Sequence, residues 1–173
     1  MSASRTISIS TVDAVTLAAD IVEPSHAVAA AVLCHPHPAY GGNRFNTVTQ
    51  ACFDALPDHN VRTLRFDFRD ALRSPSDDPP AGLDLAAHDV RAAIDAVRPS
   101  TECPLLIIGY SYGALATLAA LGAQQGTGHL AALALIAPAL SVHTMQLAAP
   151  VPTLVAVPEH DQFCPPDAAR VAV

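Results

Sequence analysis

Residues 104–122 read PLLIIGYSYGALATLAALG, an apolar run followed by a glycine-flanked serine and then a stretch rich in alanine and leucine. The apolar run predicts a strand over residues 104–108 that is buried on both faces, and the last stretch predicts a helix over residues 113–123. Between them, residues 109–113 match the pattern G-x-S-x-G. In this context the pattern predicts a sharp strand-to-helix turn that presents Ser111 as a nucleophile.

The spacing of the two glycines has a steric reason. A turn that lifts the hydroxyl of Ser111 clear of the sheet requires strained backbone angles at that residue. Close packing of the flanking strand and helix is expected to leave no room for side chains at Gly109 and Gly113. The same turn directs helix amides at a reacting carbonyl, where negative charge develops. The alternative is a tight turn without chemistry, since short glycine motifs recur by chance.

Strand and helix patterns alternate on both sides of this turn. The further strands are expected at residues 6–10, 15–23, 27–34, 61–68, 130–137 and 153–157, and the further helices at residues 45–56, 83–97 and from 166 onward. The first two strands are expected to form a hairpin. The alternation predicts one α/β domain over residues 1–173, with a mostly parallel, doubly wound sheet and helices on both faces. Active residues are then expected at the carboxyl ends of the strands.

Composition narrows the classes of partner. The 173 residues are 51% hydrophobic and 14% charged, with a net charge of −7 and no cluster of lysine and arginine. This argues against nucleic acid or an anionic membrane and favours a small, neutral substrate. The N-terminus lacks the apolar region of a signal peptide, so we expect a cytoplasmic protein. The four cysteines form no C-x-x-C pair, so neither a zinc site nor a disulfide framework is expected.

Residues 35–42 read HPHPAYGG and follow the strand expected at residues 27–34. A second donor for the developing negative charge is expected from this loop. Proline has no amide hydrogen, so His37 carries the only backbone donor between His35 and Ala39. We therefore expect the amides of His37 and Tyr112 to form an oxyanion hole.

Two alternatives concern the side chains of this loop. His35 and His37 could bind a metal together with Asp161, but the flanking prolines rigidify the loop without supplying a third ligand. A metal is therefore not expected. The ring of His35 is instead expected to cap the loop by hydrogen bonding beneath the site. Gly41 and Gly42 are expected to support the site from the end of the loop.

A candidate acid follows the strand expected at residues 153–157. Asp161 is expected to be the carboxylate that orients a catalytic histidine, with Glu159 less favoured. A serine followed by an acid is the chain order of α/β hydrolases. The alternative is that Asp161 is a solvated carboxylate in a turn.

The histidine of such a triad should follow the acid, yet residues 162–173 contain none. His160 is poorly placed, because adjacent side chains at a strand end point apart. The other histidines fall on outer loops or a helix: His26, His59, His88, His129 and His143. We therefore expect the catalytic histidine beyond residue 173, with about one C-terminal strand and one helix missing. The strand at residues 153–157 should then lie at or near the sheet edge.

With these residues in place, the chain resembles the small, lidless bacterial α/β hydrolases related to the dienelactone hydrolase and serine aminopeptidase groups. The resemblance covers nearly the whole chain and rests on HPHPAYGG, RFDFR at residues 65–69, GYSYG and EHDQFCPP at residues 159–166. It implies the α/β-hydrolase fold, with Ser111 as nucleophile, Asp161 as acid and a histidine in a later loop. Relatives tend to have glycine at the position of Asp70. Dienelactone hydrolases proper have cysteine at the elbow, so Ser111 favours ester chemistry.

The leading hypothesis is therefore a serine hydrolase that acts on a small acyl substrate without metal or organic cofactor. The second is a binding module that keeps the pocket without the triad, or an inactive fragment. The third is a metal-dependent hydrolase that uses His35 and His37. Short or accessible substrates are favoured, since the sequence leaves room only for a small lid. No sequence pattern points to a particular oligomeric state.

Overall fold

The computed structural model describes residues 3–71, 82–98, 103–122, 130–140 and 151–172. Its strands form one sheet in the order β1-β2-β4-β3-β5-β6-β7. The strands are β1 (Arg5–Ser10), β2 (Thr16–Val22), β3 (Ala29–Cys34), β4 (Val61–Phe66), β5 (Leu105–Tyr110), β6 (Leu130–Ile136) and β7 (Thr153–Ala156). β2 runs antiparallel to both of its neighbours, β1 and β4, and all other neighbouring strands are parallel. The hairpin and the mostly parallel sheet predicted above are confirmed.

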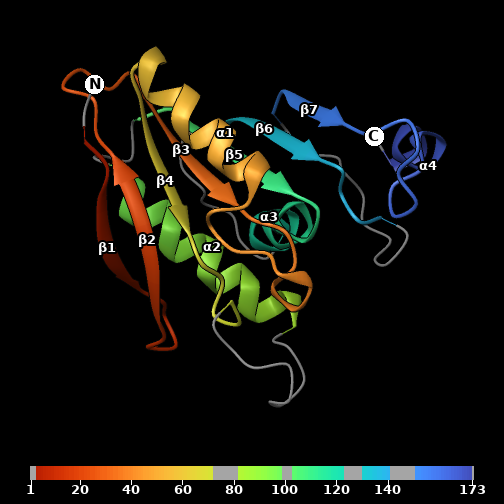
Figure 1. Cartoon of the computed structure of the whole chain (residues 1–173), viewed down its shortest axis with the longest axis horizontal. Coiled ribbons are helices and arrows are strands. Elements are labelled where there is room, and N and C mark those ends of the chain that lie inside the picture. The colour runs from red at the N-terminus through yellow and green to blue at the C-terminus, as the bar shows by residue number, and fades with distance from the viewer. Residues whose placement is uncertain (1–2, 72–81, 99–102, 123–129, 141–150, 173) are drawn as a thin grey trace.

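Helices cover both faces of this sheet. They are α1 (Thr47–Ala55), α2 (Leu83–Val97), α3 (Tyr112–Gly122) and α4 (Pro166–Ala172), with short 3-10 helices η1 (Pro38–Tyr40) and η2 (Leu56–His59). In Figure 1, α1 lies in front of the sheet and α2 and α3 lie behind it. Within the described ranges, no helix is long and apolar enough to span a membrane.

Side chains of β3 alternate between the two faces of the sheet and contribute to the hydrophobic core on each face. Val32 packs into the large cluster that α2 and α3 share with the strands, whereas Leu33 packs with Phe53 of α1. Successive side chains of a strand point to opposite faces, so one strand serves both layers. The doubly wound architecture follows directly from this apolar, two-sided strand.

Several element boundaries differ from the prediction by one or two residues, and two of these differences have an identifiable reason. β5 runs two residues past the predicted end, because Gly109 still pairs with Cys34 and Tyr110 with Ile136. α1 starts later than expected, since the Asn46 side chain accepts a hydrogen bond from the Val48 amide and caps the helix. β4 ends at Phe66 rather than at residue 68. Residues 72–81, which follow β4 in the chain, lie outside the described residues, as do His129 and His143.

β7 stands at the edge of the sheet. Among the described residues it pairs only with β6, as the prediction of an edge strand required. Leu154 of this strand is 64% exposed. Figure 1 shows β7 and α4 at the opposite end of the molecule from the β1-β2 hairpin.

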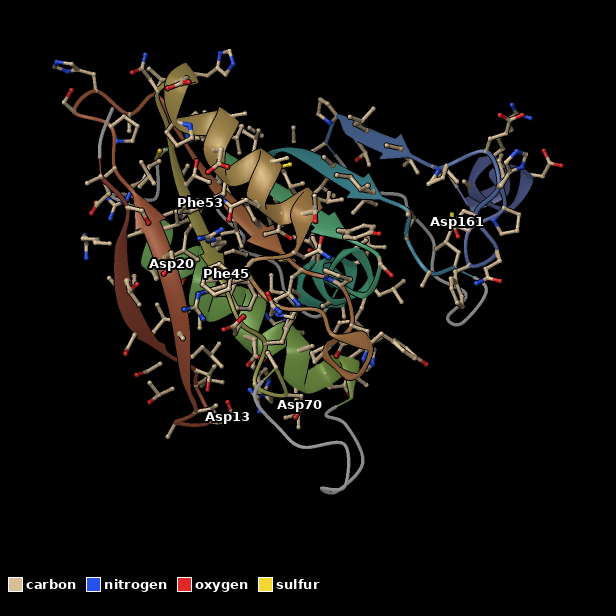
Figure 2. The ribbon with its side chains drawn as sticks, in the orientation of Figure 1. Asp13, Asp20, Phe45, Phe53, Asp70 and Asp161 are labelled. Carbon is tan, nitrogen blue, oxygen red and sulfur yellow. The ribbon has the colours of Figure 1, made fainter. Side chains whose placement is uncertain are left out.

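Buried charge fixes the segment that follows β4. Arg69 donates to Asp89 of α2 from its backbone amide (3.0 Å), its Nε (2.9 Å) and its Nη2 (2.7 Å), and it also pairs with Asp13 (2.6 Å). Asp13 lies in the turn of the β1-β2 hairpin, as Figure 2 shows. One guanidinium therefore ties together the hairpin, α2 and the loop that carries Asp70.

Candidate active site

The turn between β5 and α3 consists of a single residue, Ser111. β5 ends at Tyr110 and α3 begins at Tyr112. Ser111 has φ +54°, a left-handed conformation that non-glycine residues rarely adopt. Its amide donates to the Ile136 carbonyl (2.8 Å) and its carbonyl accepts from the Ala114 amide (3.1 Å). The predicted strained strand-to-helix turn is therefore present, anchored to β6 on one side and to α3 on the other.

The flanking glycines are packed against backbone. A Cβ at Gly109 would lie 2.6 Å from the Cα of Ala114, and a Cβ at Gly113 would lie 2.7 Å from the carbonyl oxygen of His35. Real Cβ atoms essentially never come within 3.0 Å of such atoms. Larger residues at either position would push the helix away from β3 or β5.

The loop after β3 folds back on itself next to this turn. The His37 carbonyl accepts hydrogen bonds from the amides of Tyr40 and Gly42, both at 3.1 Å. Gly41 has φ +80° at the end of η1, in the left-handed region that glycine adopts most readily. A Cβ at Gly42 would lie 2.8 Å from the His37 carbonyl oxygen. The two glycines thus allow the loop to close around His37.

The ring of His35 is fully buried and hydrogen bonded at both nitrogens. Its Nε2 accepts from the Phe68 amide (3.0 Å), so its Nδ1 carries the proton and donates to the Pro36 carbonyl (2.6 Å). Burial lowers the pKa of His35 to about 4. The ring joins the HPHP loop to the end of β4, and with both nitrogens engaged it has no lone pair left for a metal.

A cavity of about 210 Å³ opens beside Ser111. The other residues that line it are His37, Tyr40, Tyr112, Leu115, Ala139 and Phe163. None of these carries a formal charge when His37 is neutral. The ring centroid of His37 lies 4.5 Å from that of Tyr112 and 5.4 Å from that of Tyr40. The structure therefore brings Ser111, His37 and Tyr112 together around one cavity.

Burial shifts the pKa values of two rings in the cavity, those of His37 and Tyr112. Burial lowers the pKa of His37, an effect that the carboxylate of Asp70 opposes. Burial, together with the charges of Asp70 and Asp89, raises the pKa of Tyr112 to about 12. The carboxylate of Asp70 therefore acts on both rings in the same direction, raising the pKa of each.

Asp161 follows β7 and lies beside α4 (Figure 2). Its Oδ1 accepts hydrogen bonds from the amides of Phe163 (2.7 Å) and Cys164 (2.9 Å). It does not itself line the cavity, although Phe163, two residues later, does. Glu159 and His160 are exposed in the preceding turn. Among the described residues, His37 is the one histidine that lines the cavity with Ser111.

Sequence reasoning missed several walls of the cavity. Tyr40, Leu115, Ala139 and Phe163 come from four separate segments, so no local motif unites them. Two of them could have been predicted from their positions in the sequence: Tyr40 belongs to the HPHPAYGG loop, and Phe163 follows the candidate acid. Leu115 and Ala139 can be assigned to the cavity only from the folded structure, in which α3 and the end of β6 lie side by side.

Comparison with known proteins gives the family. A family model described as serine aminopeptidase, S33, matches residues 25–165. An α/β serine hydrolase without lid from Xanthomonas campestris is similar in structure, with 24% identity and a TM-score of 0.79 over 97% of this chain and 77% of that chain. An α/β serine hydrolase homologue from Coxiella burnetii has 22% identity and a TM-score of 0.76, over 98% and 80% of the two chains.

A dienelactone hydrolase from Anabaena variabilis also shares the fold, with 19% identity and a TM-score of 0.68 over 90% of this chain and 73% of that chain. No curated protein matches the chain. The predicted resemblance to these hydrolase groups is confirmed. Because the family model spans most of the chain and the solved structures share its fold, the protein belongs to the serine aminopeptidase S33 family and has the α/β-hydrolase fold.

Proposed function

We propose that the protein hydrolyses ester-type bonds of small, uncharged acyl substrates, with Ser111 as the nucleophile. The observation that carries this proposal is the left-handed Ser111 at a one-residue turn, directly beside an uncharged cavity. Strain of this kind persists where the surrounding structure enforces it, and it clusters at active sites. Family membership supports a hydrolase, and the cavity supports the class of substrate.

The oxyanion hole in this proposal is formed by the backbone amides of His37 and Tyr112. Tyr112 is the first residue of α3, and the first amides of a helix have no acceptor within the helix. Within the described part of the chain, no acceptor lies on the His37 amide, while the His37 carbonyl is occupied by Tyr40 and Gly42. Backbone donors at these two positions beside Ser111 would stabilise the negative oxygen of a tetrahedral intermediate.

The acid in this proposal is Asp161, and the base is a histidine from a segment that follows residue 173. The base takes the proton of the Ser111 hydroxyl as its oxygen attacks the carbonyl carbon, and then passes that proton to the departing alcohol. Water, deprotonated by the same base, releases the acid and restores the hydroxyl. The Oδ1 of Asp161 is held by two amides, so its carboxylate has a fixed orientation that could position the histidine.

The size and chemistry of the cavity restrict the acyl group. About 210 Å³ is small for a ligand site. Tyr40, Tyr112 and Phe163 present aromatic surface, which suits a short acyl chain or a single ring. A substrate with a free amino terminus would need an anionic partner, and none of the described residues that line the cavity is an acid. We therefore favour esters over amino-terminal peptides.

The test compares hydrolysis of p-nitrophenyl acetate with that of leucine p-nitroanilide, using protein isolated from its native source and matched variants. Ser111→Ala is expected to reduce ester hydrolysis to the uncatalysed background. Ser8→Ala, on the exposed strand β1, is the control and should retain the full rate. Equal ester hydrolysis by the wild type and Ser111→Ala would refute the nucleophile. A preference for the anilide would refute the ester class.

A binding module without catalysis is the second candidate. It is favoured by one observation: no histidine in the described residues other than His37 lines the cavity beside Ser111. Such a protein would bind a small uncharged ligand and release it unchanged. The same assay distinguishes the two candidates, because a binding module would not hydrolyse the ester.

A further inference from the structure

The side chain of His37, and not only its amide, has a defined chemical state at the cavity. Its Nδ1 accepts a hydrogen bond from the Ala39 amide at 3.1 Å, within the turn that starts η1. An amide can only donate, so Nδ1 must carry a lone pair. A neutral imidazole has one N–H, and the proton therefore resides on Nε2. The fold of the loop thus selects one tautomer.

The protonated nitrogen has no hydrogen-bond partner among the described residues. No described residue accepts a hydrogen bond from Nε2, and the ring packs instead against the rings of Tyr112 and Tyr40. The ring is half-buried and forms part of the cavity wall next to Ser111. A polar N–H on a wall that is mostly aromatic and aliphatic gains stability when a ligand oxygen accepts from it.

We propose that the Nε2–H of His37 is a fixed hydrogen-bond donor that selects substrates with an uncharged oxygen acceptor beside the reacting carbon. The assignment rests on the proposed function for the reaction itself, but it concerns binding at the cavity. It also means that His37 cannot be the base of the triad in this state. Its Nε2 already holds a proton and its Nδ1 is occupied by Ala39.

Nearby charge determines which acceptor fits. The carboxylate of Asp70, in the loop after β4 (Figure 2), acts on both His37 and Tyr112. A neutral ester, ketone or amide oxygen can accept from Nε2–H without bringing a second negative charge toward Asp70. The substrate class is therefore a neutral carbonyl compound with an apolar or aromatic group.

Two substitutions separate the side-chain donor from the cap of the loop. His37→Asn keeps an oxygen where Nδ1 accepts from Ala39, but it places no donor at the position of Nε2. His37→Gln places an amide N–H near the position of Nε2 and loses the cap. Both variants retain the backbone amide of residue 37. The comparison therefore isolates the imidazole from the proposed oxyanion donor.

The probe is acetophenone, a neutral aryl ketone that is not hydrolysed, titrated by NMR against the protein carrying Ser111→Ala. His37→Asn is expected to weaken binding by about 3- to 10-fold, the size of one net hydrogen bond. His37→Gln is expected to bind within about 2-fold of the parent, since it restores the donor. Equal affinity for the parent and His37→Asn would overturn the proposal, as would equal weakening by both substitutions.

A second measurement tests the tautomer without any ligand. Long-range ¹H–¹⁵N spectra of the imidazole distinguish its protonated nitrogen from its unprotonated one. A proton on Nε2 at pH 7.5 is expected, and a proton on Nδ1 would overturn the assignment. Neither experiment requires Ser111 to react. Failure of ester hydrolysis would therefore count against the proposed function alone.

Discussion

Gly113 lies against the backbone of His35, where a Cβ would come within 2.7 Å of the His35 carbonyl oxygen. This contact sets the distance between α3, which carries the turn at Ser111, and the end of β3, which carries the HPHP loop. The carbonyl of Cys34 is closer still. Because Gly113 has no side chain, the nucleophile and the proposed oxyanion loop can lie close together.

The first prediction concerns this contact. Gly113→Ala should destabilise the protein by about 2 kcal/mol or more, because the added methyl group must displace backbone. Gly122→Ala, in the same helix with open space around it, is the control and should be neutral or stabilising. Urea unfolding of both variants checks this. Similar stabilities for the two variants would contradict the packing described for α3.

The second prediction concerns pH and the buried ring of His35. Its pKa is lowered to about 4 in the folded protein, against an ordinary value of 6.5. Between these values the unfolded chain binds a proton that the folded protein does not, so stability rises with pH. The contribution of His35 is complete above pH 6.5 and is lost as the pH falls toward 4, a change of roughly 3 kcal/mol.

Unfolding free energies at pH 7.5 and pH 4.5 measure this contribution. His35→Gln keeps an acceptor for the Phe68 amide and does not titrate, so its stability should depend less on pH than that of the wild type. His26→Gln, at an exposed position, should leave the dependence unchanged. If His35→Gln kept the full pH dependence of the wild type, another group would be responsible.

The third prediction concerns the buried charge behind the site. Asp89 is fully buried, and burial raises its pKa despite the Arg69 guanidinium beside it. Asp89→Asn should destabilise the protein by roughly 3 kcal/mol, because it leaves the half-buried Arg69 undercompensated. Asp167→Asn, from an exposed pair with Arg170, should change stability by less than about 1 kcal/mol. Equal effects in thermal unfolding would contradict a structural role for Asp89.

The fourth prediction concerns the acid. Asp161→Asn should lower kcat for ester hydrolysis by a factor of about 10⁴ in protein that carries the catalytic histidine, as loss of the orienting carboxylate does in serine hydrolases. Glu159→Gln, in the same turn and fully solvated, should leave kcat unchanged. The reverse ranking would assign the acid to Glu159. If both variants kept the kcat of the wild type, neither carboxylate would take part in the mechanism.

Local patterns predicted the parts of the site that local geometry determines. The G-x-S-x-G spacing at residues 109–113 predicts a tight turn, and the structure has Ser111 there in a left-handed conformation. The prolines at 36 and 38 likewise identify His37 as the available amide. These inferences need only covalent chemistry and neighbours in sequence.

Features that depend on packing were not accessible in the same way. The cavity walls at Tyr40, Ala139 and Phe163 belong to loops after β3, β6 and β7, which meet only in the folded sheet. The tautomer of His37 depends on how η1 turns back toward it. Arg69, the chain neighbour of Asp70, is anchored to Asp89 of α2, which lies twenty residues further along the chain. The cavity walls and the contact of Arg69 with Asp89 join residues that are far apart in the chain, so the sequence could not predict them.

The measurement that tests the central claim most directly is intact-mass detection of fluorophosphonate labelling on protein from its native source, with Ser111→Ala in parallel. The account predicts one covalent label that maps to Ser111, on a species heavier than the 17.9 kDa of these 173 residues. Absence of label from the wild type, or an equal label on Ser111→Ala, would contradict the assignment of Ser111 as the nucleophile of a serine hydrolase.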